Sequence, residues 1–236
     1  MDSLRQRITR SIAQRGVLGT IPMCWWSLCS LLRPAARRLE RQREEADALF
    51  DREHGVDTGG VVRPGPEAVI GPHWAHGISY QAVDANEFAQ SLARLEINPP
   101  EFTFVDYGCG KGRALLLAAR LPFRKVVGVE YCRTLADTAV KNIDKVSRAL
   151  PCSVIEVSVA DAAVFPIPAG PLVLFFFNPF GEAVMKEVVN NVARSLFEQP
   201  RPVKVVYFTP YFARLWESAG FKRTADSPAI LEWSPP

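Results

Sequence analysis

Residues 102–119 constrain the fold more than any other part of the chain. An apolar run ends at Asp106, three glycines follow at alternate positions (Gly108, Gly110 and Gly112), and an aliphatic segment begins at once. Glycine has no Cβ, so such a turn can adopt positive φ and a ligand can approach its backbone closely. The first N–H groups of the following helix would face that ligand. The pattern predicts a buried strand, a tight turn and a helix, with a nucleotide-type pocket at the end of the strand.

Strands and helices alternate along the rest of the chain. The predicted strands span residues 102–106, 125–130, 153–159, 172–177 and 203–208, with a closing pair at 221–224 and 229–233. The predicted helices span residues 113–121, about 134–150 and 184–196, and a short one passes through Trp216 and closes at Gly220. The strands are continuous apolar runs, which is typical of a parallel sheet covered by helices on both faces. We therefore expect an α/β fold.

Composition divides the chain into three parts. Residues 1–60 form a basic and apolar helical extension with a linker, residues 61–100 a lead-in region with one helix, and residues 101–236 the α/β domain. The net charge of +3 is concentrated at the start: residues 1–52 hold ten arginines and six acidic residues, whereas the rest holds 18 basic and 19 acidic residues. The basic bias is therefore a property of the N-terminal part.

An uncharged apolar run at residues 17–32 contains Trp25 and Trp26. A spanning helix needs about 20 apolar residues, and this shorter run is interrupted by Pro22. Two interpretations stay open. The run lies in the interface of an anionic membrane, which predicts a cytoplasmic protein held peripherally at the inner face. Alternatively it docks on the α/β domain or in a dimer.

The next segment is highly charged. Its apolar residues stand near helical spacing and predict a partly exposed helix over about residues 34–52 that packs through an apolar stripe; they are Ala36, Leu39, Ala46, Leu49 and Phe50. Residues 55–60, rich in glycine, predict an irregular linker.

Two helix starts have the form of a cap. Asp84-x-x-Glu87 predicts a capping box, and the apolar residues that follow it lie on one helical face; they are Phe88, Leu92 and Leu95. Thr134-x-x-Asp137 predicts the start of the second helix of the α/β domain.

The cysteines and histidines bear on whether disulfides or a metal site are expected. Five cysteines, an odd number without a C-x-x-C pair, indicate the reduced thiols of a cytosolic protein. His73-x-x-His76 has a spacing compatible with metal ligation, but no cysteine or carboxylate cluster accompanies it, so no metal is expected. In the glycine turn we expect Cys109 to fill space and Lys111 to face solvent.

The spacing of the turn discriminates between ligands. It is Gly-x-Gly-x-Gly, not the G-x-G-x-x-G of dinucleotide sites, and Asp106 stands two positions before the first glycine. A carboxylate there would repel a pyrophosphate but would favour a ligand that carries a cation. S-adenosylmethionine (SAM) has an ammonium and a sulfonium group and no phosphate.

Asp106-Tyr-Gly-Cys-Gly-Lys-Gly112 resembles motif I of the class I SAM-dependent methyltransferases, and the resemblance covers roughly residues 80–236. It implies a Rossmann-like, seven-stranded, mostly parallel sheet with helices on both faces, here with an N-terminal helical extension. It also implies that Glu130 accepts hydrogen bonds from the ribose hydroxyls and that Asp161, with the Ala162 N–H, contacts the adenine. Tyr80 matches an N-terminal aromatic residue that lies over the cofactor in several members, although a merely buried tyrosine explains it equally well.

Asn178-Pro179-Phe180 resembles motif IV of the same family, the segment that borders the methyl acceptor. Enzymes that methylate amino groups of bases or glutamine carry Asn/Asp-Pro-Pro-Tyr/Phe, so this chain is one proline short. The resemblance implies that Asn178 accepts a hydrogen bond from a substrate N–H and borders the cofactor, with Phe180 as a wall. It favours a nitrogen acceptor. The motif I string is also similar to that of non-SET protein lysine methyltransferases, which makes protein lysine a candidate acceptor.

Other functions stay open beside this hypothesis. Nucleic acid is less supported as a partner, because the α/β domain is slightly acidic and has no basic stripe. A small-molecule O- or N-methyltransferase, a non-catalytic SAM-binding relative and an NAD-type oxidoreductase are the alternatives. The oligomeric state is left undetermined.

Overall fold

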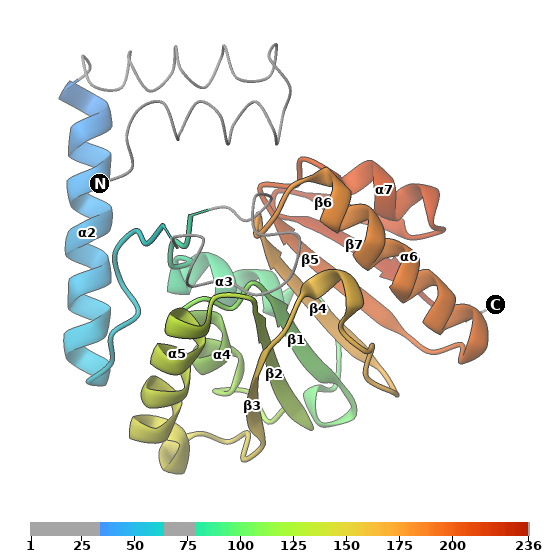
Figure 1. The fold of residues 1–236 in the computed structure, drawn as a ribbon, viewed down its shortest axis with the longest axis horizontal. Helices are drawn as coiled ribbons and strands as arrows, with labels where there is room; N and C mark the ends of the chain where they lie inside the picture. Colours follow the sequence, from blue (N-terminus) through green and yellow to red (C-terminus); the bar gives the residue numbers. More distant parts are fainter. Residues whose placement is uncertain (1–33, 64–78, 236) are drawn as a thin grey trace.

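The computed structural model describes residues 34–63 and 79–235 (Figure 1). The apolar run at residues 17–32 and the pair His73 and His76 lie outside the described residues. In the part that is described, no helix is long and apolar enough to cross a membrane.

Seven strands form one sheet in the order β3-β2-β1-β4-β5-β7-β6. The strands are β1 Thr103–Tyr107, β2 Lys125–Glu130, β3 Ile155–Val159, β4 Leu172–Phe177, β5 Val203–Phe208, β6 Lys222–Asp226 and β7 Ala229–Trp233. Neighbours are parallel from β3 to β5, whereas β7 runs antiparallel between β5 and β6. The predicted seven-stranded, mostly parallel α/β fold is confirmed.

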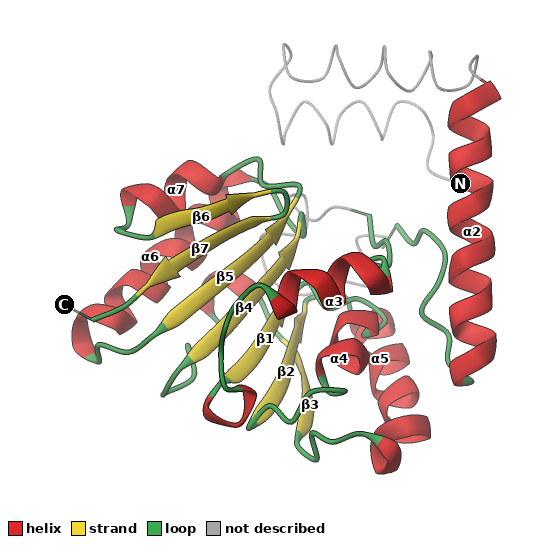
Figure 2. Cartoon of the chain, turned by 180° about the vertical axis from the view of Figure 1, so that it is seen from behind, coloured by secondary structure: helices red, strands yellow, loops and turns green. Residues whose placement is uncertain are grey.

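Helices cover both faces of the sheet, as the apolar strands require. They are α2 Pro34–His54, α3 Ala85–Ala93, α4 Arg113–Ala118, α5 Arg133–Val146, α6 Glu182–Glu198 and α7 Ala213–Ser218. Successive strand residues point to opposite faces, so Phe104 joins the core under α3, α4 and α5, whereas Val105 joins the core under α6 and α7. Figure 2 shows the two groups of helices on opposite sides of the sheet.

Some predicted boundaries are wrong by a few residues. Strand β1 starts and ends one residue later than expected, β3 starts at Ile155, and α4 ends at Ala118. Helix α5 begins at Arg133 with Cys132 at its N-cap. Thr134 is therefore not the cap; it lies inside the first turn, where its hydroxyl is 3.2 Å from the Cys132 Sγ.

The predicted cap of α3 is confirmed. The Asp84 carboxylate accepts hydrogen bonds from the N–H groups of Asn86 and Glu87, both at 2.9 Å. The side chains of Phe88 and Leu92 on this helix are buried in the core. Helix α3 thus fixes where the chain enters the α/β domain.

Helix α2 exists and is partly exposed as expected, but of its predicted apolar residues Phe50 packs on the core whereas Leu39 and Leu49 do not. Leu39 is 67% exposed and Leu49 is 45% exposed, whereas Asp47 is only 8% exposed. The packed face carries Asp47 and Phe50 because a buried arginine of the α/β domain lies against it. The predicted linker after this helix is irregular but not loose, since Thr58 is fully buried.

Candidate functional site

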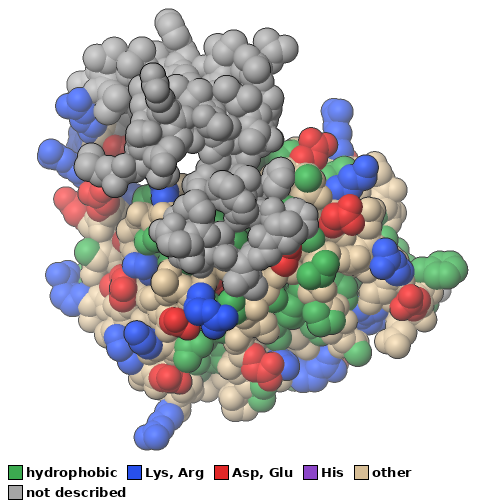
Figure 3. Space-filling view, in the orientation of Figure 1, with side chains coloured by type: hydrophobic (Ala, Val, Ile, Leu, Met, Phe, Trp, Pro, Cys, Tyr) green, Lys and Arg blue, Asp and Glu red, His purple; other side chains and the backbone are tan. Residues whose placement is uncertain are grey.

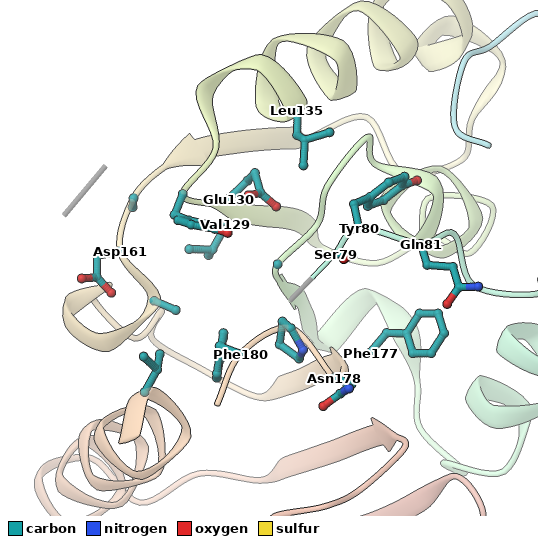
Figure 4. A pocket seen from close by; sticks show the side chains of 16 residues that line it. Ser79, Tyr80, Gln81, Val129, Glu130, Leu135, Asp161, Phe177, Asn178 and Phe180 are labelled. Carbon is teal, nitrogen blue, oxygen red and sulfur yellow. The ribbon is translucent and has the colours of Figure 1, made fainter. Parts of the chain in front are cut away.

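A cavity that is partly open to solvent lies at the C-terminal ends of β1, β2 and β4. This is the edge of an open α/β sheet where ligands usually bind. The predicted residues that line it are Tyr80, Gly108, Glu130, Asp161, Ala162, Asn178 and Phe180. Asp106 lines a smaller adjoining cavity that shares Tyr80 and Gly108 with the first. Figure 4 shows Glu130 between Tyr80 and Asp161.

The glycine turn is shaped by close contacts. Gly108 has φ 84°, and a Cβ there would lie 2.5 Å from the Cβ of Pro179. Gly110 has φ 54°, and a Cβ there would overlap the ring of Tyr80. Only glycine fits both the backbone angle and the available space at these positions. The turn is therefore packed between Tyr80 on one side and the Asn178-Pro179-Phe180 loop on the other.

Glu130 ends β2 with its side chain 3% exposed. One carboxylate oxygen accepts a hydrogen bond from the Gly110 N–H at 2.8 Å and the other from the Cys132 N–H at 2.9 Å. A carboxylate has about four acceptor positions, so its backbone hydrogen bonds leave capacity for a ligand. Burial raises the pKa of Glu130 to about 7 against the opposing effect of these hydrogen bonds. Glu130 thus both braces the turn and faces the cavity.

Asp106 is the second buried carboxyl group here, 3% exposed. Burial, and then the nearby Glu130 charge, raise the pKa of Asp106 well above its usual value. Two carboxyl groups that are costly to ionise make the site one that gains from a cationic ligand. Burial also raises the pKa of the Cys109 thiol, which agrees with a space-filling role for that residue and not a nucleophilic one.

Asp161 and Ala162 lie where β3 ends. One Asp161 oxygen accepts a hydrogen bond from the Ala163 N–H at 2.9 Å and caps the short helical turn Ala162–Val164. The predicted contact residue therefore has a local structural role as well. The Asp161 carboxylate and the backbone of Ala162 both line the cavity, where they can face a ligand's polar edge.

Asn178 follows β4 in a left-handed conformation, φ 45°, which a non-glycine residue rarely adopts. Its Oδ1 atom is buried with no hydrogen-bond partner in the described part of the chain. Since Asn178 also lines the cavity, this acceptor is available to a donor group of a ligand. Phe180 is 6% exposed and lines the cavity, and the pattern Phe-Asn-Pro-Phe places both at one turn.

The same pattern recurs one strand away, and the sequence interpretation missed it. Phe208-Thr209-Pro210-Tyr211 ends β5, and Thr209 is also left-handed, with φ 54°. Phe208 is the register partner of Phe177, and their rings lie 5.8 Å apart. The signal was available as the repeated Phe-x-Pro-aromatic string.

Lys111 and Arg113 are the second group missed. The expectation that Lys111 faces solvent is wrong: its side chain is 14% exposed, and its Nζ lies 2.7 Å from an Asp57 carboxylate oxygen. Arg113 is 4% exposed and forms ion pairs with Asp47 and Asp51 of α2. The sequence signal was two acidic residues four apart on one face of α2.

Among the described residues, no group of three or more His, Cys, Asp or Glu could hold a metal ion. The arrangement instead offers a glycine turn, two buried carboxyl groups at neighbouring strand ends, and an amide acceptor on a third strand.

The strand order, the antiparallel β7 and the cavity at the strand ends define the class I SAM-dependent methyltransferase fold. Solved structures share this fold. A predicted N6-adenine-specific DNA methylase from Listeria monocytogenes str. 4b F2365 superposes with a TM-score of 0.50 at 16% identity over 65% of this chain; the match spans about half, 52%, of that protein.

Two further neighbours are more distant in TM-score. An RNA methyltransferase from Salinibacter ruber, solved with S-adenosyl-L-homocysteine, gives 0.44 at 18% identity over 66% of this chain and 94% of that one. A ribosomal protein L11 methylase from Lactobacillus delbrueckii subsp. bulgaricus gives 0.46 at 14% identity over 72% and 83%. No family model and no curated protein sequence matches the chain. These identities establish the fold alone.

Proposed function

We propose that this protein binds SAM in the described cavity and transfers its methyl group to an acceptor, most simply a nitrogen. The observation that carries the proposal is the pair of buried carboxyl groups, Asp106 and Glu130, beside a glycine turn. The cationic groups of SAM would compensate their charge. A pyrophosphate would be repelled by the same carboxylates, which disfavours the NAD-type alternative.

The predicted cavity residues can each be matched to one part of SAM. The acceptor capacity that Glu130 retains fits the vicinal hydroxyls of a ribose. Asp161 and the backbone of Ala162 fit the amino edge of an adenine. Asp106 and the glycine turn then remain for the charged amino-acid end.

Once the methyl donor and the acceptor are aligned, the protein has few further catalytic tasks. Bound SAM would supply a methyl group already activated by the sulfonium. The Asn178 oxygen would hold an acceptor N–H and so orient the nitrogen lone pair, while Pro179 and Phe180 exclude water. A general base is needed only when the acceptor is protonated at working pH.

The acceptor class is argued from Asn178. The unpartnered Asn178 Oδ1 favours a neutral N–H donor. The structural neighbours select no acceptor class, since their printed names include RNA and DNA methylases and a ribosomal protein methylase. On the face shown in Figure 3, acidic and basic side chains are interspersed over the described residues, so this face carries no continuous basic patch of the kind that binds nucleic acid.

The location is part of the same proposal. Cys109, Cys132 and Cys152 are free thiols, which supports action in the reducing cytoplasm. Peripheral contact of residues 17–32 with an anionic membrane stays a separate proposal.

Transfer of a labelled methyl group from SAM into protein, nucleic-acid and small-molecule fractions of a lysate tests the function. We expect one labelled fraction, with Asn178→Ala labelling it far less and still binding SAM. Lys125→Met, which removes a surface ion pair with Glu156, serves as the matched control. Binding of SAM without labelling in any fraction would instead support a non-catalytic SAM-binding protein.

A further inference from the structure

We infer that Asp47, Asp51, Thr58 and Arg113, here called the Thr58 cluster, are positioning residues that hold the cofactor cavity in shape. The inference rests on the proposed function, because it assigns these residues to the SAM site. It makes the end of α2 and the segment after it a framework of that site and not a separate extension.

Arg113 is the first link. It is the first residue of α4, directly after Gly112 of the turn, and its side chain is 4% exposed. Its guanidinium pairs with Asp47, lies 3.4 Å from an Asp51 carboxylate oxygen and donates from Nε to the Thr58 hydroxyl at 2.7 Å. A buried guanidinium is very costly without such partners. The start of α4 is therefore held to α2.

Thr58 is the second link and is fully buried. Its N–H and its hydroxyl both donate to the Asp51 carboxylate, at 2.9 and 2.6 Å. Its carbonyl accepts a hydrogen bond from the Tyr80 hydroxyl at 2.6 Å. One residue of the predicted linker thus joins α2, the start of α4 and Tyr80.

Tyr80 carries the connection into the cavity. Its ring covers Gly110 closely enough to exclude a Cβ there, and it lines the cavity itself. Burial raises the pKa of Tyr80 and keeps its hydroxyl protonated as a donor to Thr58. A shift of Thr58 would therefore move a wall of the cavity and free the turn beneath it.

A parallel set of contacts holds the middle of the turn. The buried Asn142 of α5 accepts from the Asp57 N–H at 2.9 Å and donates to the carbonyls of Asp57 and Lys111, at 2.8 and 3.0 Å. The Lys111 ammonium in turn contacts the Asp57 carboxylate. Residues 110, 111 and 113 are thus each held by the segment 47–59 or by Tyr80. Such preorganisation lowers the ordering cost of binding.

Thr58→Val tests the inference, with Thr58→Ser as the conservative variant that keeps the hydroxyl. Calorimetric titration with S-adenosylhomocysteine, at a temperature where circular dichroism shows each full-length variant folded, gives the affinity. We expect Thr58→Val to bind at least fivefold more weakly and Thr58→Ser to stay within twofold of the wild type. Amide hydrogen exchange of residues 107–112 should become faster in Thr58→Val alone.

A purely structural role predicts a different result. It would lower the melting temperature of Thr58→Val but leave the affinity of the folded protein unchanged, and that outcome overturns the inference. The double variant Asp47→Leu/Arg113→Met covers the case in which Thr58→Val does not fold. It removes both charges together, and we expect weak binding from a folded protein; wild-type affinity would overturn the inference. Failure of the wild type to bind SAM or S-adenosylhomocysteine would refute the proposed function itself.

Discussion

The affinity for S-adenosylhomocysteine should rise with pH between 6 and 7.5. Glu130 has a pKa of about 7 in the free protein because it is buried, and ribose hydroxyls bind its ionised form. Below pH 7 part of the binding free energy is consumed in removing the proton. For one group of this pKa the affinity changes by roughly eightfold over that range, or about 1.2 kcal/mol.

Ligand binding should be coupled to proton release. Because binding favours the carboxylate, a proton should be released, and calorimetry in two buffers of different ionisation enthalpy should count it. Asp106, whose pKa is also raised, adds in the same direction. Glu130→Gln cannot titrate, so it should bind more weakly by about 1.5–3 kcal/mol and show a flatter profile. An affinity that is constant or falls from pH 6 to 7.5 in the wild type would refute the reasoning.

Three further outcomes are expected. Gly110→Ala should bind S-adenosylhomocysteine at least tenfold more weakly, because its Cβ overlaps the ring of Tyr80. Gly60→Ala is the control: Gly60 also has a positive φ, 80°, but has open space around it, so this variant should keep the wild-type affinity. An equal loss of affinity in both variants would argue against a packing cause. The free energy of unfolding of the free protein should fall as pH rises from 4.5 to 7. The raised folded-state pKa of Glu130 makes its ionisation in the folded protein cost up to about 3 kcal/mol. Chemical denaturation at several pH values measures this loss, which should be smaller in Glu130→Gln. Residues 1–33 should confer salt-sensitive binding to anionic liposomes, and unchanged liposome binding after their deletion, which keeps Asp47 and Asp51 as partners of Arg113, would exclude the membrane interpretation.

The sheet and much of the cavity could be predicted from the sequence because both follow local rules. Continuous apolar runs identified β2, β4, β5 and β7 with their observed ends. Parallel strands bring their C-terminal ends to one edge, so Asp106, Glu130 and Asp161 were expected together before any contact was known.

The framework behind the turn could not be predicted, because it depends on buried charges far apart in the chain. Arg113 and Asp47 are 66 residues apart, and a charged helix is ordinarily expected to pack through its apolar residues. In this protein the helix instead packs Asp47 against the buried Arg113 guanidinium, and Leu39 and Leu49 are exposed to solvent. Thr58 stood in a glycine-rich string whose composition is typical of a linker, and only the structure shows the partners of its hydroxyl.

The central claim is that the cavity beside Asp106 and Glu130 is a SAM site. Calorimetric titration of the wild type, of Asp106→Asn and of Asp137→Asn, which changes an exposed carboxylate on α5, with SAM and with NAD tests it most directly. We predict that SAM but not NAD binds the wild type, that Asp106→Asn weakens SAM by about 1.5–3 kcal/mol, and that Asp137→Asn binds normally. Wild-type affinity in Asp106→Asn, or no SAM binding at all, would contradict the account.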